Sequence, residues 1–165
     1  KGAALRTAAR WIAAHGGEYM ITLDADGQHD PADLVRFFPL LTPDSTTLVV
    51  GVRDFAGYVP WRSRLGRRLS NLMIRFATGI AVADSQSGFR AYPVRWLTTL
   101  PSCPAEGFAY ATEVLVRSCR DGLPVLQVPV TVHYPPPKQR ISHFSWWRDT
   151  LAIARVHFRL LCNWR

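Results

Sequence analysis

Two carboxylates stand two residues apart at the end of a short apolar run, in the sequence Leu23-Asp24-Ala25-Asp26-Gly27-Gln28. The run over residues 19–23 lies between turn-forming residues, which is typical of a buried strand. Since side chains alternate along an extended chain, Asp24, Asp26 and Gln28 are predicted to lean toward one side. Their hard oxygen ligands suit Mg²⁺ or Mn²⁺, and such a metal can neutralise the charge that grows on a departing diphosphate. The alternative interpretation is a solvated acidic turn.

Arginine dominates the next part of the chain. Six arginines and one acidic residue, Asp54, lie in the region from Arg53 to Arg75. Guanidinium groups bind phosphate oxygens through two parallel hydrogen bonds, so this region is a candidate phosphate-binding surface. The alternative is a solvated helix face, because Arg64, Arg68 and Arg75 share one side of a predicted helix.

Two further polar segments accompany these groups. The turn Asp84-Ser85-Gln86-Ser87-Gly88-Phe89-Arg90 leads into a predicted strand, and Arg140-Ile141-Ser142-His143 follows three consecutive prolines. The prolines predict a stiff, exposed loop, and the basic residues after them are typical of a mobile lid. Taken singly, each segment also has an ordinary explanation as a surface loop.

The elements that must position these groups alternate between helical and strand periodicity, which predicts one α/β domain with a parallel sheet core. A helix over residues 62–79 is predicted to bury an apolar stripe of Leu65, Leu69, Leu72 and Phe76. Pro129 interrupts the last predicted strand and marks it as an edge strand. The other predicted elements are helices over residues 3–15, 31–41 (capped by Asp30), 108–120 and 146–161, and strands over residues 19–23, 46–50, 88–92 and 125–134.

The composition is that of a globular and strongly basic protein. The chain has 165 residues, 48% of them hydrophobic, and a formal net charge of +8. This length allows one domain with a hydrophobic core and argues against disorder. All but two of the 20 basic residues are arginines, which suits binding of nucleotides, phospholipid surfaces or nucleic acid.

Three widely spaced cysteines favour buried thiols in a reducing compartment over a disulfide framework or a zinc site. No apolar run is long enough to span a bilayer.

Together the motifs resemble the glycosyltransferases of family 2, and among them the polyprenyl-phosphate branch that includes dolichyl-phosphate mannosyltransferase-like enzymes. The resemblance reaches to about residue 145 and rests on residues 24–31, on Val50-Gly51-Val52-Arg53, on residues 84–90, and on Val128-Pro129-Val130 with the loop of Arg140 and Ser142. The opening residues 1–5 match the family segment before the acidic strand. We therefore expect a strand–helix–strand unit that binds base and ribose to precede them.

The resemblance implies the GT-A fold, an α/β nucleotide-diphospho-sugar transferase fold with a mixed sheet flanked by helices, here truncated at its N-terminus. Residues 1–145 would be the C-terminal two-thirds of the catalytic domain, and residues 146–165 an amphipathic helix. The expected enzyme is a metal-dependent, inverting hexosyltransferase. It would move a sugar from a UDP- or GDP-linked donor to a membrane-associated acceptor, a polyprenyl phosphate or another envelope lipid.

By the same likeness, the donor side of the site is assigned to five residues. Asp24 would contact the nucleotide sugar, while Asp26 and Gln28 would hold Mg²⁺ or Mn²⁺, with Asp24 as a further candidate ligand. Asp26 is also a candidate catalytic residue. Arg140 and Ser142 would lie on the loop that closes over the diphosphate.

The acceptor side is assigned to Asp84 and a set of arginines. Asp84 would lie beside the sugar as the second candidate catalytic residue. A phosphate monoester has a second pKa of about 6 and is largely ionised at neutral pH, so it needs little help from a base. A hydroxyl acceptor would need one, and Asp84 is the candidate. The candidate ligands of an acceptor phosphate are Arg53, Arg64, Arg67, Arg68 and Arg90.

The predicted C-terminal helix points to a membrane. Arg148, Arg155 and Arg159 form one narrow stripe, and apolar residues and tryptophans cover most of the remaining surface. This pattern is typical of an interfacial helix on anionic lipid, although a helix packed on the core with extended arginines has the same pattern. We expect a cytoplasmic protein that is peripheral on the cytoplasmic face of the membrane.

Two other functions explain single features. A D-x-D-G sequence after a strand is also similar to haloacid-dehalogenase phosphatases, but Gln28 stands where those proteins normally have Thr or Val. A non-catalytic phosphate- or nucleic-acid-binding module would explain the arginines. Because Asp24, Asp26 and Asp84 would repel nucleic-acid phosphates, no nucleic-acid partner is expected.

Overall fold

The computed structural model describes residues 2–43, 46–54, 61–100 and 107–133, with backbone alone at 61–63 and 107–108, and also Arg155 and Phe158. The expected lid of Arg140 and Ser142 lies outside these residues. So does the predicted helix over 146–161, apart from Arg155 and Phe158, which are helical and exposed. Among the described residues, no helix combines the length and apolar character needed to cross a bilayer.

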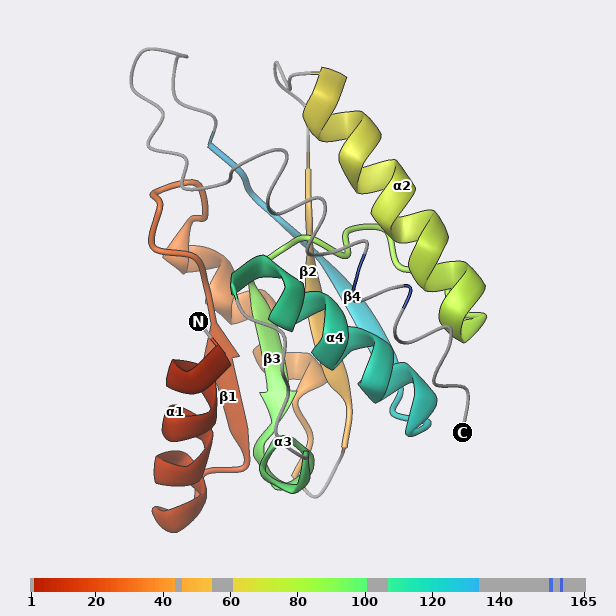
Figure 1. Ribbon diagram of the computed structural model, residues 1–165. Coiled ribbons are helices and arrows are strands. Elements are labelled where there is room, and N and C mark those ends of the chain that lie inside the picture. Colours follow the sequence, from red (N-terminus) through yellow and green to blue (C-terminus); the bar gives the residue numbers. More distant parts are fainter. Residues whose placement is uncertain are drawn as a thin grey trace.

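Four strands form one sheet in the order β1-β3-β2-β4 (Figure 1). The strands are β1 (Tyr19–Thr22), β2 (Leu48–Arg53), β3 (Arg90–Pro93) and β4 (Val125–Val130). β3 runs antiparallel to both of its neighbours, and among the described strands β2 and β4 are the pair that runs parallel. The mixed sheet is confirmed; the predicted parallel core is represented by the pairing of β2 with β4, and β3 is inserted antiparallel between β1 and β2. β4 lies at the edge of the described sheet, as Pro129 predicts.

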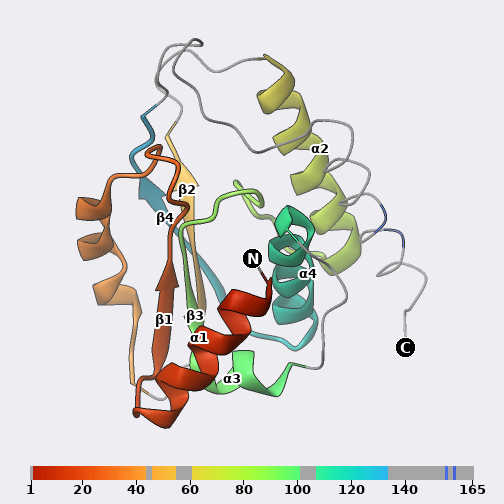
Figure 2. The same cartoon turned by 60° about the vertical axis from the view of Figure 1, so that its left-hand side comes forward.

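Helices cover both faces of the sheet, as Figure 2 shows. One face carries α1 (Gly2–Ala14), α3 (Val94–Thr99) and α4 (Gly107–Arg120), which pack on strand residues such as Leu48, Val50 and Tyr92. The other face carries two 3₁₀ helices, η1 (Pro31–Arg36) and η2 (Phe38–Leu40). There Phe37 stacks on Phe89, with ring centroids 4.6 Å apart. The alternation of side chains along each strand supplies both cores.

The segment after Asp30 forms 3₁₀ turns and not the continuous helix predicted over residues 31–41. Asp30 does cap it, since its Oδ1 accepts a hydrogen bond from the Ala32 backbone N at 2.9 Å. Pro39 lacks the N–H that an α-helix would use at that point, which favours two short pieces over one helix.

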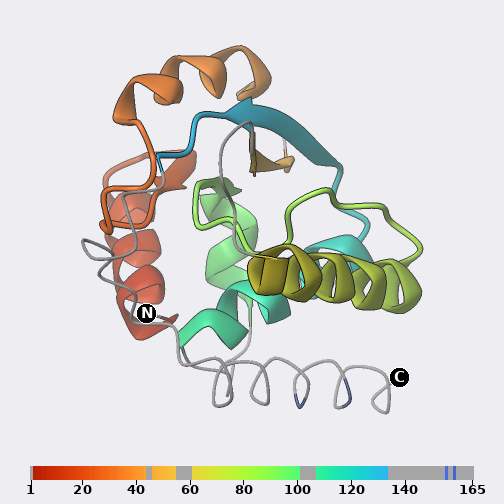
Figure 3. The same cartoon turned by 90° about the horizontal axis from the view of Figure 1, so that it is seen from above.

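Helix α2 (Trp61–Thr78) forms where it is predicted but faces the opposite way. From Arg64 to Thr78, where its side chains are described, Ser70, Ile74 and Ala77 are buried. The four residues predicted as its core face are exposed instead: Leu65 by 56%, Leu69 by 52%, Leu72 by 49% and Phe76 by 74%. Helical periodicity shows which residues share a face, but here the face of Ser70, Ile74 and Ala77 is turned to the protein, and α2 contacts α4. Figure 3 shows α2 along one side of the molecule.

Candidate active site

Four segments that are distant in the sequence meet at one edge of the sheet. β1, β2 and β4 all end there, at Thr22, Arg53 and Val130, and β3 begins there because it runs in the opposite direction. The acidic turn after β1, the end of β2 and the turn that precedes β3 therefore lie together. Loops at the carboxyl ends of strands are where open α/β sheets bind ligands.

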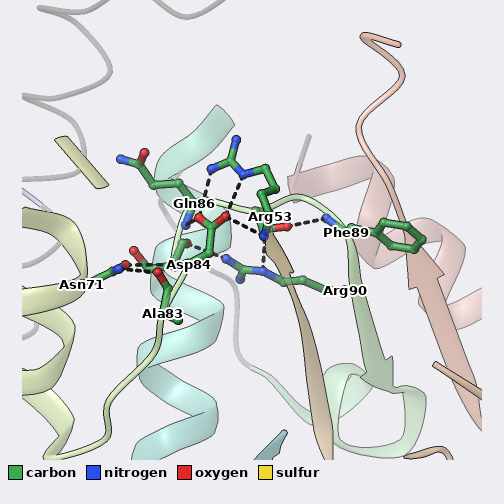
Figure 4. A network of polar contacts seen from close by, with 9 residues as sticks. Arg53, Asn71, Ala83, Asp84, Gln86, Phe89 and Arg90 are labelled. Atoms are coloured by element: carbon green, nitrogen blue, oxygen red, sulfur yellow. Dashed lines mark hydrogen bonds and ion pairs between the residues drawn. The ribbon is translucent and has the colours of Figure 1, made fainter. Parts of the chain in front are cut away.

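A bidentate ion pair joins the end of β2 to the turn that precedes β3 (Figure 4). Arg53 donates from Nε to Asp84 Oδ2 at 2.7 Å and from Nη2 to Asp84 Oδ1 at 2.9 Å. The backbone N–H groups of Arg53 and Gln86 also donate to the same carboxylate, each at 3.3 Å. Asp84 is fully buried, and the Arg53 side chain is 15% exposed. The carboxylate is thus held by four donors beneath a partly accessible guanidinium.

The turn that carries Asp84 is supported from α2. Asn71 accepts a hydrogen bond from the Ser85 backbone N at 2.9 Å and donates to the Ala83 carbonyl at 2.6 Å. Ser85 and Ser70 share a hydrogen bond between their hydroxyls at 2.9 Å. These contacts bracket Asp84 on both sides and fix where its carboxylate points.

Arg90 supports the same turn from inside the protein. Its side chain is fully buried, and its guanidinium donates to three backbone carbonyls, those of Ser85, Ser87 and Ala111, at 2.6 to 2.9 Å. The expectation that Arg90 binds the acceptor phosphate is therefore corrected. It is a structural residue, because a fully buried guanidinium engaged with three carbonyls is not presented to a ligand.

The carboxylate of Asp24 lies directly against the backbone of Gly88. A Cβ atom added at Gly88 would overlap with both carboxylate oxygens. Nearby, the hydroxyl of Thr22 donates to the Gly88 carbonyl at 3.0 Å. The last residues before the acidic turn are thereby tied to the turn of Asp84, and the glycine is needed for the close approach.

Replacing Gly88 with alanine is expected to displace the Asp24 carboxylate and to lower the sugar-transfer activity that the family resemblance implies by at least about 10-fold, since small misplacements of positioning groups are costly. Gly66, in α2, is the matched control because a Cβ there meets no atom within 4 Å. Gly66→Ala should stabilise the helix by about 0.5–1 kcal/mol and keep activity. Steady-state rates and urea unfolding of both variants check this. Equal activity in the two variants would show that the Asp24–Gly88 contact is unimportant.

The acidic turn itself is short and mostly exposed. Asp26 Oδ1 accepts a hydrogen bond from the Gln28 backbone N at 3.0 Å, and Gly27 between them has a φ of 74°. The Gln28 carbonyl accepts from the His133 backbone N at 2.8 Å, so the segment after β4 holds the turn in place. Asp26 is exposed, while Asp24 and Gln28 are half-buried. All three predicted metal ligands thus lie in one turn at the sheet edge.

His29 lies near the charged groups of this edge. It is buried with its ring edge-on to Phe89. Burial lowers the pKa of His29 and nearby Arg53 lowers it further, while the carboxylates of Asp24, Asp26 and Asp84 act in the opposite direction. A charge affects the pKa of a group only when it lies nearby. The direct contacts of Arg53 with Asp84 and of Asp24 with Gly88 place these groups at the same edge of the sheet.

The other predicted arginines lie on α2. Arg64 and Arg68 are exposed, and Arg67 is half-buried. The beginning of α2 points to the same end of the molecule as the end of β2 (Figures 1 and 2). These arginines lie in the first half of α2.

Sequence reasoning did not predict the supporting contacts of three residues: Asn71, Gly88 and His29. Helical periodicity places Asn71 on the polar face of α2, and Gly88 and His29 are parts of longer motifs. For Asn71 a sequence signal does exist, because it is a polar residue in the helix that comes directly before the turn of Asp84. No sequence signal indicates that Gly88 contacts Asp24, which lies more than 60 residues earlier.

Residues 1–100 match the family described as Glycosyl transferase family 2. This chain belongs to that family. The family 2 domain is similar to the polyprenol monophosphomannose synthase of Mycolicibacterium smegmatis, with 28% identity over 79% of the chain and 51% of the relative. It is 30% identical to the UDP-N-acetylglucosamine–dolichyl-phosphate N-acetylglucosaminyltransferase of Methanococcus voltae, over 88% of the chain and 58% of the relative. The chain thus spans little more than half the length of these relatives.

Solved structures confirm the GT-A fold of the family 2 domain. Glucosyl-3-phosphoglycerate synthase from Mycobacterium tuberculosis, in complex with Mn²⁺, UDP-glucose and phosphoglyceric acid, matches with a TM-score of 0.66 and 23% identity. That match covers 97% of the chain and 54% of the synthase. A complex of the same synthase with Mn²⁺, UDP-glucose and glycerol 3-phosphate matches at 25% identity and a TM-score of 0.61. This match covers 99% of the chain and 54% of the synthase.

Proposed function

We propose that the protein transfers a sugar, with inversion, from a UDP- or GDP-linked donor to the phosphate of a membrane-held polyprenyl phosphate or similar envelope lipid. The names of its relatives support this proposal, because one is a synthase of polyprenol monophosphomannose and the other is an N-acetylglucosaminyltransferase named for dolichyl phosphate. A location at the cytoplasmic face of a membrane belongs to the same proposal, since that is where nucleotide sugars and such a lipid phosphate would meet.

One observation carries the proposal: carboxylates and a guanidinium occupy the same edge of the sheet. The Asp24 carboxylate lies against Gly88 in the turn that carries Asp84, Arg53 pairs with Asp84, and Asp26 lies in the same acidic turn as Asp24. A surface that only bound nucleic acid would be weakened by three carboxylates at its centre. A transferase uses both signs of charge, because it must hold a metal–diphosphate complex and a second anion close together.

The donor side suits Mg²⁺ or Mn²⁺. Within the described ranges, no three His, Cys, Asp or Glu side chains form a complete metal cage. Mg²⁺ is usually held by one or two carboxylates together with substrate phosphates and water, so Asp26, Gln28 and Asp24 are a sufficient protein contribution. When bound, the metal would offset the negative charge of the departing nucleoside diphosphate.

The acceptor side favours a phosphate over a hydroxyl. Asp84 already accepts four hydrogen bonds, two of them from the Arg53 side chain, and is fully buried. A carboxylate held in this way is a poor general base, because its lone pairs are engaged with donors. An ionised phosphate needs no base, and Arg53 can help to hold it with the α2 arginines Arg64, Arg67 and Arg68.

The proposed reaction then needs little proton transfer. An oxygen of the acceptor phosphate forms a bond to the anomeric carbon of the sugar, and the bond from that carbon to the donor diphosphate breaks. The electron pair leaves with the nucleoside diphosphate. The enzyme contributes orientation and electrostatic stabilisation, with Asp84 and Asn71 acting through the position of Arg53 and its loop.

Transfer of radiolabelled sugar tests the proposal directly. We expect the full-length protein, with Mn²⁺ and a panel of UDP- and GDP-sugars, to label a polyprenyl phosphate and to leave the corresponding polyprenol unlabelled. NMR of the product should show the inverted anomer. Labelling of the polyprenol, or equal labelling of both lipids, would refute a phosphate acceptor, and absence of transfer from every donor would refute the activity.

A further inference from the structure

Residues 129–133, the last two of β4 and the three that follow, lie between the two halves of the candidate site. We call them the β4 tail. On one side of the tail, Val130 is the register partner of Arg53 at the end of β2. On the other side, the His133 backbone N donates to the Gln28 carbonyl in the acidic turn at 2.8 Å. The β4 tail therefore connects the candidate metal turn to the arginine of the acceptor side.

The outer edge of the β4 tail needs partners other than a strand. β4 is the last strand of the described sheet on this side. The Val130 carbonyl points toward β2, because it accepts a hydrogen bond from the Asp54 backbone N at 3.0 Å. Main-chain groups alternate in direction along an extended chain, so those of Pro129 and Thr131 point away from β2. Such groups are rarely left unpaired in a folded protein.

Two side chains of η1 take the place of a neighbouring strand. Asp33 Oδ2 accepts a hydrogen bond from the Thr131 backbone N, and Arg36 Nη1 donates to the Pro129 carbonyl at 3.0 Å. The two side chains also pair with each other, since Arg36 Nε lies 3.0 Å from Asp33 Oδ1. Asp33 is 5% exposed, whereas the Arg36 side chain is 46% exposed. Because water competes less for buried groups, the carboxylate is the firmer of the two attachments.

Beyond these two side chains, main chain pairs directly with main chain. His29, next to the acidic turn, forms an antiparallel bridge with Val132. The contact of Asp33 with the β4 tail fixes the register of this pairing. A slip that brought Pro129 to Asp33 would fail, because proline has no N–H to donate. A slip by one residue would turn the donating N–H toward β2.

From these contacts we infer that Asp33 is a positioning residue, which acts through the β4 tail to set the distance between the acidic turn and Arg53. The catalytic meaning of this distance rests on the proposed function, in which a metal–diphosphate group and an acceptor phosphate are held at those two places. The acidic turn keeps its own hydrogen bond from the Gln28 backbone N to Asp26. Asp33 therefore governs where the turn lies, while the ligands of the proposed metal belong to the turn itself.

Replacing Asp33 with alanine removes the acceptor of the Thr131 N–H. In the full-length protein, we expect kcat for transfer to polyprenyl phosphate to fall by at least about 10-fold, because small misplacements of reacting groups are costly. The Kd of UDP or GDP with Mn²⁺ should change by less than about threefold, since the contacts within the acidic turn remain. A residue that only stabilised the fold would leave the kcat of the folded protein unchanged.

Two variants serve as controls. Asp33→Asn keeps an amide oxygen that can accept from the Thr131 N–H, and it gives up an ion pair whose partner, Arg36, is half exposed. Since exposed pairs contribute little, its kcat should stay within about threefold of the wild type. Asp121→Ala removes the acceptor of Trp96 Nε1, at 2.8 Å, near the opposite end of the sheet, where β3 ends and β4 begins. It should lower stability and leave kcat unchanged.

Amide hydrogen exchange tests the inference without measuring transfer. In NMR spectra of the full-length protein, Asp33→Ala should speed exchange at Thr131 and at His133 by at least about 10-fold. Asp33→Asn and Asp121→Ala should leave the protection of His133 as in the wild type. A wild type that transfers no sugar would refute the proposed function alone, because exchange at His133 still shows whether Asp33 positions the β4 tail.

Two results would overturn the inference. One is unchanged exchange at His133 in folded Asp33→Ala. The other is a kcat that falls equally in Asp33→Ala and Asp121→Ala at equal concentrations of folded protein. Should Asp33→Ala not fold, Arg36→Ala takes its place, because Arg36 is partly on the surface. Loss of its bond to Pro129 should speed exchange at His133 by about threefold, and unchanged exchange there would overturn the inference as well.

Discussion

Replacing Asp26 with alanine is expected to abolish metal-dependent binding of UDP or GDP and to leave the protein folded. Asp26 is exposed, and its one described hydrogen bond goes to the neighbouring Gln28 backbone N. Little of the folding free energy therefore depends on it. Asp26 is, however, a proposed direct ligand of the metal. Its loss should weaken nucleotide binding in the presence of Mn²⁺ by at least about 100-fold, because even residues that only support metal ligands contribute up to about that factor.

Asp30 provides the matched control, because it is another carboxylate in the same segment with a purely structural contact. It caps η1 through the Ala32 backbone N at 2.9 Å. Asp30→Ala should cost about 1 kcal/mol of stability and retain nucleotide binding. Isothermal titration with Mn²⁺ and with EDTA, together with urea unfolding, measures both properties. Metal-dependent binding that survives in Asp26→Ala would remove the acidic turn from the donor site.

Replacing Arg53 with alanine is expected to destabilise the protein and to eliminate transfer. Without Arg53, the fully buried Asp84 carboxylate loses both of its side-chain donors. Breaking a buried ion pair by removing one partner typically costs about 3–5 kcal/mol, and the lower end applies because Arg53 is partly exposed. The additional change Asp84→Asn should recover part of this stability, since it removes the unpaired charge, but it should not recover activity.

A second ion pair of similar burial allows stability and catalysis to be separated. Arg117 donates to the fully buried Glu113 at 2.7 Å within α4, and neither residue belongs to the segments at the sheet edge. Arg117→Ala should therefore lower the urea midpoint in a comparable way while the folded protein keeps its transfer rate. If both arginine variants lost activity in proportion to stability alone, Arg53 would have only a structural role.

The amino-acid sequence by itself determined which local elements form and which residue types they carry. The apolar run of β1, the cap at Asp30 and the long helix α2 depend on contacts close in the chain, so periodicity and capping preferences predict them. The order of the motifs was also sufficient to indicate the family. Local sequence therefore assigns most candidate groups to a strand end, a turn or a helix.

Only the tertiary structure decided how these groups are used. β3 enters the sheet antiparallel between β1 and β2, and this non-local pairing brings Gly88 against Asp24 and Asp84 under Arg53. Periodicity could not show which face of α2 is buried, because that depends on non-local contacts such as those of Ser70 and Asn71 with the turn of Asp84. Likewise, whether an arginine binds a ligand or the protein's own carbonyls, as Arg90 does, depends on what the fold packs around it.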